Sequence, residues 1–398
     1  MFNTSSRERL DEVAVPFNYS SRNLWNRKFT TILTAGGMAL VTFVFSAVMM
    51  LAAGLEKTLV DTGSPENVII LRGAAETEVS SSIERDQADI IVAQPEVEHD
   101  SVGDPLAAKE TLLLVTLPKR MTEIPTNVIV RGMGRHSMEL RPQVKLVAGR
   151  SPRPGSNEVI AGKNIAESIK NSDLGNKLNL AMIGWNVVGI FDAGSAAFNS
   201  EVWADADQIM AAFRRNSFSA MVMKVPGKEK FIKLKKRLET DPRLSVQVKR
   251  EIAFYKEQSE MMSKFIKLLG FAMTLFFSVG AILGAMVTMY AAVANRTREI
   301  GTLRAIGFGR QNIMLAFLSE SIFLGFLGGL VGTLSSSALQ LLTISTLNWE
   351  TFSEIAFSFR LTPSIALKSM GFALIMGLVG GMSPAWRAAS LKIVDSLR

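Results

Sequence analysis

The closest approach of this sequence to a nucleotide-binding motif is a glycine–lysine pair. A phosphate loop reads GxxxxGK followed by Ser or Thr, because its backbone N–H groups, lysine and hydroxyl together hold phosphates and magnesium. In Gly162–Lys163, Asn157 occupies the position of the first glycine and Asn164 follows the lysine. The other pair, Gly227–Lys228, has Val222 and Glu229 at these two positions. The sequence therefore predicts no ATPase site in this chain.

Other catalytic and metal-binding chemistry has little support in the sequence. The chain has no cysteine, which excludes disulfides, a thiolate nucleophile and Cys-based metal ligation. Its two histidines, His99 and His136, follow no metal-ligand spacing. The chain contains no HExxH or GxSxG motif and no paired acidic residues within its apolar runs. We therefore expect no catalytic residue, no metal ion and no cofactor bound by this chain.

Glu320 is the only charged residue in a long apolar run, 313–344. An ionisable side chain at membrane depth is costly and often functional. Two interpretations stay open. The carboxylate is structural, paired with a partner or directed to the membrane surface, or it takes part in the mechanism.

Four apolar runs dominate the organisation of the chain. The sequence has 398 residues, 48% of them hydrophobic, and each run reaches the about 20 residues that cross a bilayer. The first run is too long for a signal peptide and lacks a clear cleavage site. The predicted segments are a cytoplasmic N-terminal segment (1–28), transmembrane helices (29–55, 263–294, 313–344 and 363–385), an extracytoplasmic domain (56–262), a cytoplasmic coupling segment (295–312), an extracytoplasmic connector (345–362) and a cytoplasmic tail (386–398).

Basic residues set the predicted orientation. The net charge is +8, yet residues 56–262 contain 28 Lys and Arg against 28 Asp and Glu. The excess lies beside the apolar runs, at Arg22, Arg27, Lys28, Arg296, Arg298, Arg304, Arg310, Arg387, Lys392 and Arg398. With four spans these residues share one side, which the positive-inside rule assigns to the cytoplasm, together with both termini. This placement argues against a nucleic-acid-binding face.

The polar segment 56–262 has an α+β pattern. Extended runs are expected at 67–71, 111–117, 127–131, 158–161, 185–191 and 219–225, and helices at 82–93, 163–170, 205–214 and 228–239. Asp205 is a plausible helix N-cap. Residues 150–157 predict a loop between two subdomains. The fold class expected is an α-helical integral membrane protein with four transmembrane helices and a large extracytoplasmic α+β domain between the first and second.

The segment 295–312 joins two spans on the predicted cytoplasmic side. Ile300, Leu303 and Ile306 recur among arginines, which suits a short helix on the membrane surface. One face of that helix could rest on lipid or helix ends while the other docks on a partner. From spacing alone, a simple positive-inside anchor remains the alternative.

Glycines recur at small-xxx-small spacing in the spans, which allows close helix approach. The pairs expected to pack helices are Gly280 with Gly284, Gly325 with Gly329, and Gly377 with Gly381. They favour either a sliding or dimer interface or ordinary packing within one subunit.

Three separated motifs carry a family resemblance. The run TREIGTLRAIGFGRQNI followed by FLSESIFLGFLGGLVG, and the terminal GGMSPAWRAASLKIVDSLR, resemble FtsX-like permeases of the MacB-type ABC transporter superfamily. GRSPRPGSNEVIAGKNIAE, WNVVGIF and EVWADADQI resemble the periplasmic core domain of that family. The resemblance covers nearly the whole chain in the order of the family.

The resemblance implies a permease subunit that works as a dimer, with a second identical or similar copy, on separate ATPase subunits that bind ATP and magnesium. The family's coupling helix maps onto Arg298, Glu299, Ile300, Gly301, Leu303, Arg304, Ala305, Ile306 and Gly307. The implied function is export or extraction of an amphiphilic substrate, such as a lipid, lipoprotein, lipopeptide or drug, at the outer face of the inner membrane by mechanotransmission. Membrane lipids, a periplasmic adaptor and an outer-membrane channel are further implied partners.

A second function class is implied by other FtsX-like proteins. These proteins are transmembrane signal transmitters that activate cell-wall hydrolases without moving cargo. The large two-part outer domain predicted here favours the transporter branch and leaves the alternative open.

Overall fold

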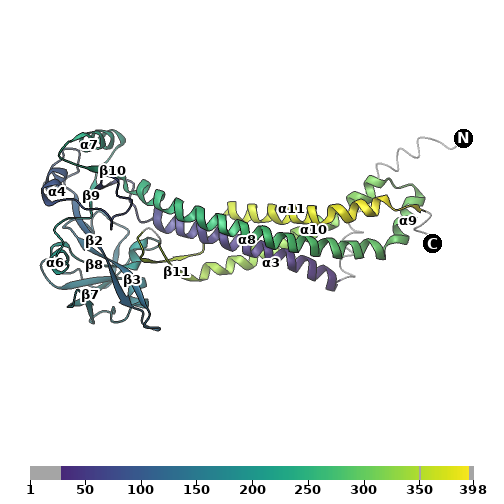
Figure 1. Cartoon of the computed structure of the whole chain (residues 1–398), viewed down its shortest axis with the longest axis horizontal. Helices are drawn as coiled ribbons and strands as arrows, with labels where there is room; N and C mark the ends of the chain where they lie inside the picture. Colours follow the sequence, from purple (N-terminus) through teal and green to yellow (C-terminus); the bar gives the residue numbers. More distant parts are fainter. Residues whose placement is uncertain (1–27, 349–350, 394–398) are drawn as a thin grey trace. The chain divides into compact units, whose positions relative to one another are not determined.

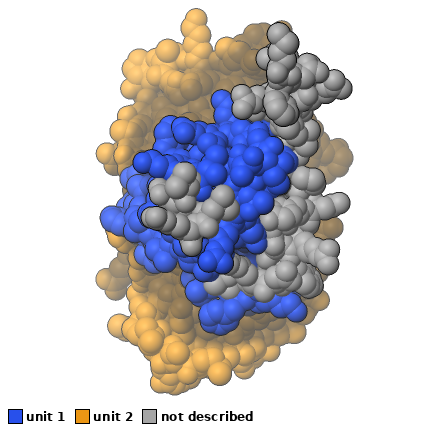
Figure 2. Space-filling model, turned by 90° about the vertical axis from the view of Figure 1, so that its right-hand side faces the viewer, with its two compact units in different colours: residues 1–53, 265–342, 359–398 blue, residues 54–264, 343–358 orange. Residues whose placement is uncertain are grey.

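The computed structural model describes residues 28–348 and 351–393. The chain forms two compact units, coloured separately in Figure 2. The helical unit comprises residues 1–53, 265–342 and 359–398, and the sheet unit comprises residues 54–264 and 343–358. Predicted flanking residues such as Arg22, Arg27 and Arg398 lie outside the described part of the chain.

Within the described residues, four helices are long and apolar enough to cross a membrane: α3 (Lys28–Val60), α8 (Glu251–Asn295), α10 (Arg310–Ser337) and α11 (Pro363–Ser390). A short helix, α9 (Thr297–Ile306), joins α8 to α10 (Figure 1). The predicted fold class, with four apolar helices and an α+β domain between the first two, is confirmed.

Each of the four helices differs from its predicted span at one end or more: α3 continues to Val60 and α11 to Ser390, past the predicted 55 and 385. α8 begins at Glu251, ahead of the predicted span that starts at residue 263. The amphipathic residues before the apolar run have a helical period and extend the same helix. α10 ends at Ser337, followed by the 3₁₀ turn η2 (Ala338–Leu341), so the predicted span to residue 344 is too long. Hydropathy continues past the helix, whereas the alternating residues of β11 (Thr343–Leu347) form a strand.

The sheet unit is built on a ten-stranded mixed sheet. Its strand order is β10-β1-β9-β2-β3-β8-β5-β7-β4, and β6 also pairs with β7. The strands are β1 (Asn67–Arg72), β2 (Ala107–Pro118), β3 (Pro125–Met133), β4 (Lys145–Gly149), β5 (Glu158–Gly162), β6 (Lys177–Leu180), β7 (Ile183–Asp192), β8 (Glu201–Asp205), β9 (Ala220–Lys224) and β10 (Val246–Arg250). The helices are α4 (Arg85–Val92), α5 (Lys163–Ser168), the 3₁₀ turn η1 (Ala197–Ser200), α6 (Ala206–Ala212) and α7 (Lys228–Thr240).

All six predicted strands and all four predicted helices of this region are present, while β4, β6, β8 and β10 were not anticipated. Asp205 is the N-cap of α6, where its Oδ1 accepts a hydrogen bond from the Gln208 backbone N–H at 3.0 Å. The loop 150–157 does not separate two subdomains, because the strands on either side of it, β4 and β5, both pair with β7.

Four hydrophobic clusters pack against this sheet, and two of them represent its two halves. One core gathers side chains of β1, β9 and β10 with those of α4 and α7, including Ile91 and Leu234. The other gathers side chains of β3, β5, β7 and β8 with those of α5 and α6, including Trp185 and Ile209. The strands β2 and β3 lie between these two halves, so contacts across them hold the unit together.

Candidate functional site

The short helix α9 is the candidate functional site because it holds the residues of the predicted coupling segment. A single residue, Arg296, separates it from α8. Gly307 ends it at φ +115°, a left-handed conformation in which its N–H bonds back to the Leu303 and Arg304 carbonyls. Glycine adopts this C-terminal cap without the strain that a Cβ would bring.

One face of α9 is exposed. Arg298, Glu299, Thr302, Ala305 and Ile306 share it, and Ile306 is 60% exposed. Gly307 is exposed beyond the helix, Leu303 and Arg304 are half-buried, and Ile300 and Gly301 are buried. Ile300 and Ile306 lie on different sides of α9, because six residues turn a helix by about 600° and leave them about 120° apart.

Ile300 anchors the opposite face of α9 in the helical unit. It is 2% exposed and belongs to a cluster that includes Val293 of α8, Ile313 and Phe317 of α10 and Ala388 of α11. The buried face of α9 therefore packs against three spans, and the opposite face is exposed.

Glu320 has a partner at the start of α9. Its Oε2 accepts a hydrogen bond from Arg296 Nη1 at 2.9 Å, and its Oε1 accepts one from Nη2 at 3.4 Å. The two side chains are 6% and 9% exposed. Glu320 is thus paired with Arg296, in line with the structural interpretation. In the sequence, Arg296 indicated only the orientation of the chain in the membrane.

The predicted glycine pairs fall into two groups. A Cβ on Gly325 would lie 3.2 Å from the Cα of Gly377, and one on Gly329 would lie 2.8 Å from the Cβ of Ala373, so both face α11. Gly381 lies against Ser321, whose hydroxyl donates to the Gly377 carbonyl at 2.6 Å. These four glycines pack α10 on α11.

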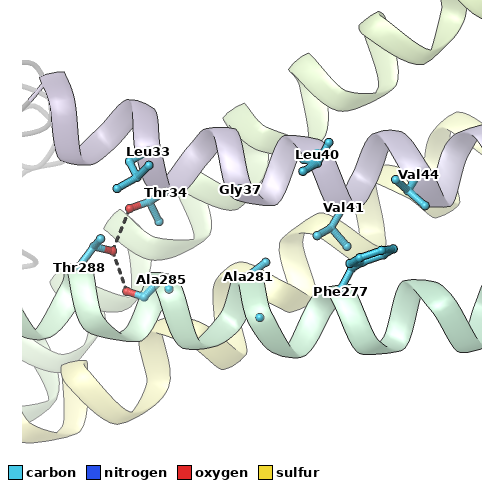
Figure 3. A pocket seen from close by; sticks show the side chains of 12 residues that line it. Leu33, Thr34, Gly37, Leu40, Val41, Val44, Phe277, Ala281, Ala285 and Thr288 are labelled. Carbon is cyan, nitrogen blue, oxygen red and sulfur yellow. Dashed lines mark hydrogen bonds between the residues drawn. The ribbon is translucent and has the colours of Figure 1, made fainter.

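Gly280 and Gly284 of α8 have open space beside them, with no heavy atom of the described structure within 4 Å of an added Cβ. They line an apolar cavity of about 430 Å³ between α3 and α8 (Figure 3). A hydrogen bond of 2.8 Å between the Thr34 and Thr288 hydroxyls lies at its edge. Gly280 and Gly284 therefore border a groove and do not pack against another helix of the described structure.

A buried ionic cluster crosses the middle strands of the sheet unit. Arg131 of β3 donates to Glu110 of β2 at 2.7 Å, to Glu201 of β8 at 2.7 Å and to Glu78 at 2.9 Å. Arg141 donates to Glu110 as well, at 2.8 Å from Nη2. Both arginine side chains are at most 1% exposed. The cluster was missed in the sequence because it joins residues distant along the chain.

The cluster sets the ionisation of its members. Burial by itself would raise the pKa of Glu110, but the charges of Arg141 and Arg131 and a hydrogen bond from Ser137 lower the pKa to about 2. Burial would lower the pKa of Arg131, and the charges of Glu201 and Glu78 raise it instead. Glu110 and Arg131 therefore remain charged and paired with each other at neutral pH.

The connector predicted at 345–362 contains a β-hairpin of the sheet unit. β11 (Thr343–Leu347) pairs antiparallel with β12 (Glu354–Ser358). Glu354 accepts hydrogen bonds from Lys119 Nζ at 2.8 Å and the Thr126 hydroxyl at 2.6 Å. The Ala356 N–H donates to the Ser200 hydroxyl at 3.2 Å. The hairpin is thus fixed to the end of the β2–β3 pair, a contact that no local sequence pattern signals.

The Gly162–Lys163 pair has a packing explanation. Gly162 ends β5 against the backbone of Asn199, where a Cβ would clash, and Lys163 pairs with Asp192 at 3.7 Å. Among the described residues, one group of possible metal ligands brings Asp100, Asp104 and His136 within 4.8 Å of one another. Arg135 already pairs with Asp104 and Glu139 with His136.

Comparison with known families gives two matches that together span most of the chain. A model described as MacB-like periplasmic core domain matches residues 31–241. A model described as FtsX-like permease C-terminal matches residues 271–393. The second match contains α9 and the Arg296–Glu320 pair.

Curated relatives are longer proteins. The chain is 30% identical over 196 residues to the macrolide export ATP-binding/permease protein MacB of Syntrophobacter fumaroxidans, covering 49% of this chain and 26% of that protein. It is 35% identical over 147 residues to the pyoverdine export ATP-binding/permease protein PvdT of Pseudomonas putida, covering 37% and 21%. The chain thus spans about a quarter of the length of these relatives.

Solved structures give a weaker likeness. The periplasmic region of MacB from Actinobacillus actinomycetemcomitans aligns with a TM-score of 0.38 and 12% sequence identity, covering 50% of this chain and 94% of that one.

Proposed function

This chain belongs to the family of MacB-like, FtsX-like ABC transporter permeases, and on that premise we propose that it couples ATP hydrolysis by a separate ATPase subunit to export or extraction of an amphiphilic substrate. ATP and magnesium bind to the partner in this proposal. The permease contributes a docking element, helices that move, and an extracytoplasmic domain that acts on cargo.

The exposed face of α9 is the observation that carries the proposal. It combines a cation at Arg298, an anion at Glu299 and an apolar side chain at Ile306 on a helix anchored from behind by Ile300. A mixed polar and apolar face on a held element suits a protein partner better than lipid, which favours one continuous apolar face. We assign Arg298, Glu299, Thr302, Ala305 and Ile306 to the contact with the ATPase.

Orientation follows from the basic flanks. Arg298, Arg304 and Arg310 lie in or beside α9, so we place this helix at the cytoplasmic face of the inner membrane. The sheet unit is then extracytoplasmic, as the family name of its matched domain supports.

Transmission would use α8 as a rod. It is one helix of 45 residues, and its sequence contains no proline to interrupt the hydrogen-bond ladder. A displacement of α9 by the ATPase would therefore act along α8 without a kink to absorb it. The ionic cluster of Arg131 and Arg141 stiffens the sheet unit that receives the motion.

The groove beside Gly280 and Gly284 supports the dimeric part of the proposal. Open glycines on an exposed helix allow a helix of a second permease copy to approach closely. Phe277 and Leu40, which line the same cavity, are 51% and 65% exposed. An apolar lining of this kind suits the acyl chain of an amphiphilic cargo at the interface between two copies.

The test is capture of the ATPase by tagged full-length chain from native membranes, followed by measurement of ATP hydrolysis. We expect Ile306→Glu to abolish association because it places a charge in the docking face. The matched control is Leu341→Glu, which changes an apolar residue that is 89% exposed in η2, outside the proposed docking face. Retention of the ATPase by Ile306→Glu would remove the assignment.

A further inference from the structure

Arg296 is the joint between the second span and the coupling helix. It is the only residue between α8 and α9, and its backbone turns there at φ −112° and ψ 14°. Its carbonyl accepts the first-turn hydrogen bond of α9 from the Ile300 N–H at 2.9 Å. A single non-helical residue with dihedrals of this kind can change the angle between two helices at small cost.

The side chain of Arg296 reaches out of that joint into α10. Its guanidinium donates to both oxygens of Glu320, and its Cζ lies 5.8 Å from the centre of the Phe317 ring. Two hydrogen bonds from one planar guanidinium to one carboxylate fix both distance and orientation. The aromatic ring adds a favourable cation–π contact on the same helix.

Both members of this ion pair are buried. Arg296 is 8% exposed and Glu320 is 5% exposed, so water cannot replace the partner without exposing a buried group. The cluster around Ile300, by contrast, is apolar and tolerates sliding of one helix over another. The ion pair is therefore the directional contact of this junction.

We propose that Arg296 and Glu320 are positioning residues that lock the angle between α9 and the spans α8 and α10. The inference rests on the proposed function, in which the ATPase displaces α9. Because the ion pair fixes the angle at Arg296, this displacement would move both spans instead of bending the joint. The locked joint also extends to α11, because α10 packs on α11 through Gly325 and Gly377.

The lock can be measured in the purified chain without its partner. Because the chain has no cysteine, introduced cysteines carry spin labels at chosen sites only. Labels at Thr302 of α9 and Leu315 of α10, both exposed, report the angle as a distance distribution in nanodiscs. We expect Arg296→Gln and Glu320→Gln each to broaden that distribution, and the exchanged pair Arg296→Glu with Glu320→Arg to narrow it again.

A second label pair separates unlocking from unfolding. Leu315 and Leu330 are both exposed on α10, and their distance depends only on that helix. It should remain unchanged in every variant. An unchanged Thr302–Leu315 distribution in both single variants, or a broadened one that the exchanged pair does not narrow, would overturn the proposal.

Coupling provides the functional readout. With the ATPase bound, we expect Arg296→Gln to retain association and lose stimulated hydrolysis, and the exchanged pair to recover it. Normal stimulation in a variant with a broadened distance would show that the lock does not transmit force. Failure of the unmodified chain to bind an ATPase would instead refute the proposed function, while the label distances would still decide whether the lock exists.

Discussion

Gly325 on α10 and Gly377 on α11 lie against each other with no room for a side chain on either. A Cβ on Gly325 would come within 2.6 Å of the Ala373 carbonyl oxygen, and one on Gly377 within 2.7 Å of the Ser321 carbonyl oxygen. Both obstacles are backbone atoms, which cannot rotate away. The closeness of these two helices is therefore set by glycine itself.

The first prediction contrasts packed and open glycines. Gly325→Ala should destabilise the folded chain by about 1–3 kcal/mol, because overpacking forces two helices apart. Gly280→Ala should leave the fold unchanged, since a Cβ there meets no described heavy atom within 4 Å. Thermal unfolding in detergent compares the two variants. Equal losses of stability would contradict the geometry.

Open glycines have a second consequence if they face another copy. Gly280→Leu with Gly284→Leu should lower the fraction of dimer measured by mass photometry in nanodiscs, because bulky side chains would block close helix approach. Gly371, which also has no heavy atom within 4 Å but lies on α11, provides the matched control as Gly371→Leu. An unchanged dimer fraction in the double variant would place the interface elsewhere.

The third prediction concerns acid stability. The folded pKa of Glu110, about 2, lies below its ordinary value of 4.5, so its contribution is present above about pH 4.5 and lost as pH falls towards 2. That contribution is on the order of 3 kcal/mol. Glu110→Gln should destabilise the chain by about 3–5 kcal/mol at pH 7, because it leaves buried arginine charge uncompensated.

The free energies of unfolding of the wild type and of Glu110→Gln should converge as the pH is lowered from about 4.5 towards 2. Denaturant unfolding followed by fluorescence of the buried Trp185 and Trp203 measures them. Glu167→Gln, at an exposed position of α5, is the control and should follow the wild-type curve. A constant difference between wild type and Glu110→Gln from pH 7 to pH 2 would exclude the pairing as the origin of the effect.

The fourth prediction tests the cap of α9. Gly307→Ala should cost about 1 kcal/mol, because alanine is strained at φ +115°. Hydrogen exchange should then accelerate for the amides of α9. Gly155→Ala introduces the same kind of strain at φ +73° in a loop of the sheet unit and should leave α9 protected. Equal protection of α9 in Gly307→Ala would argue against the cap.

The fifth prediction concerns the hairpin. Glu354→Gln weakens its charge-assisted hydrogen bonds with Lys119 and Thr126, so exchange should rise in β12 while global stability falls by about 1 kcal/mol or less. Glu123→Gln, the control, weakens a more exposed ion pair with Lys170 that does not involve the hairpin. Faster exchange in β12 for both variants would indicate general loosening.

Hydropathy and charge predicted the spans and the fold class because length, apolar content and flanking basic residues are local properties. Strands such as β6 (Lys177–Leu180) and β4 were missed because they are four or five residues long and owe their extended state to pairing with β7. A local pattern contains no record of such pairing.

The candidate site was predictable in outline only. The run of residues in α9 marked a helix between two spans, and Glu320 marked a buried charge. The pairing of Arg296 with Glu320 depends on how the chain turns between α8 and α10. That angle is set by one residue, and the spacing of residues in the sequence does not encode it. The direction in which Ile306 points likewise depended on which side of α9 the bundle covers.

Two separate segments of the chain form the sheet unit, residues 54–264 and residues 343–358. A fragment that contains only residues 54–264 would lack the hairpin, so Lys119 and Thr126 would lose their hydrogen bonds to the carboxylate of Glu354. Any study of the excised region, by crystallography or by partner screening, would therefore examine a surface that the intact protein keeps covered. Grafting residues 343–358 onto such a fragment through a flexible linker would restore the native face.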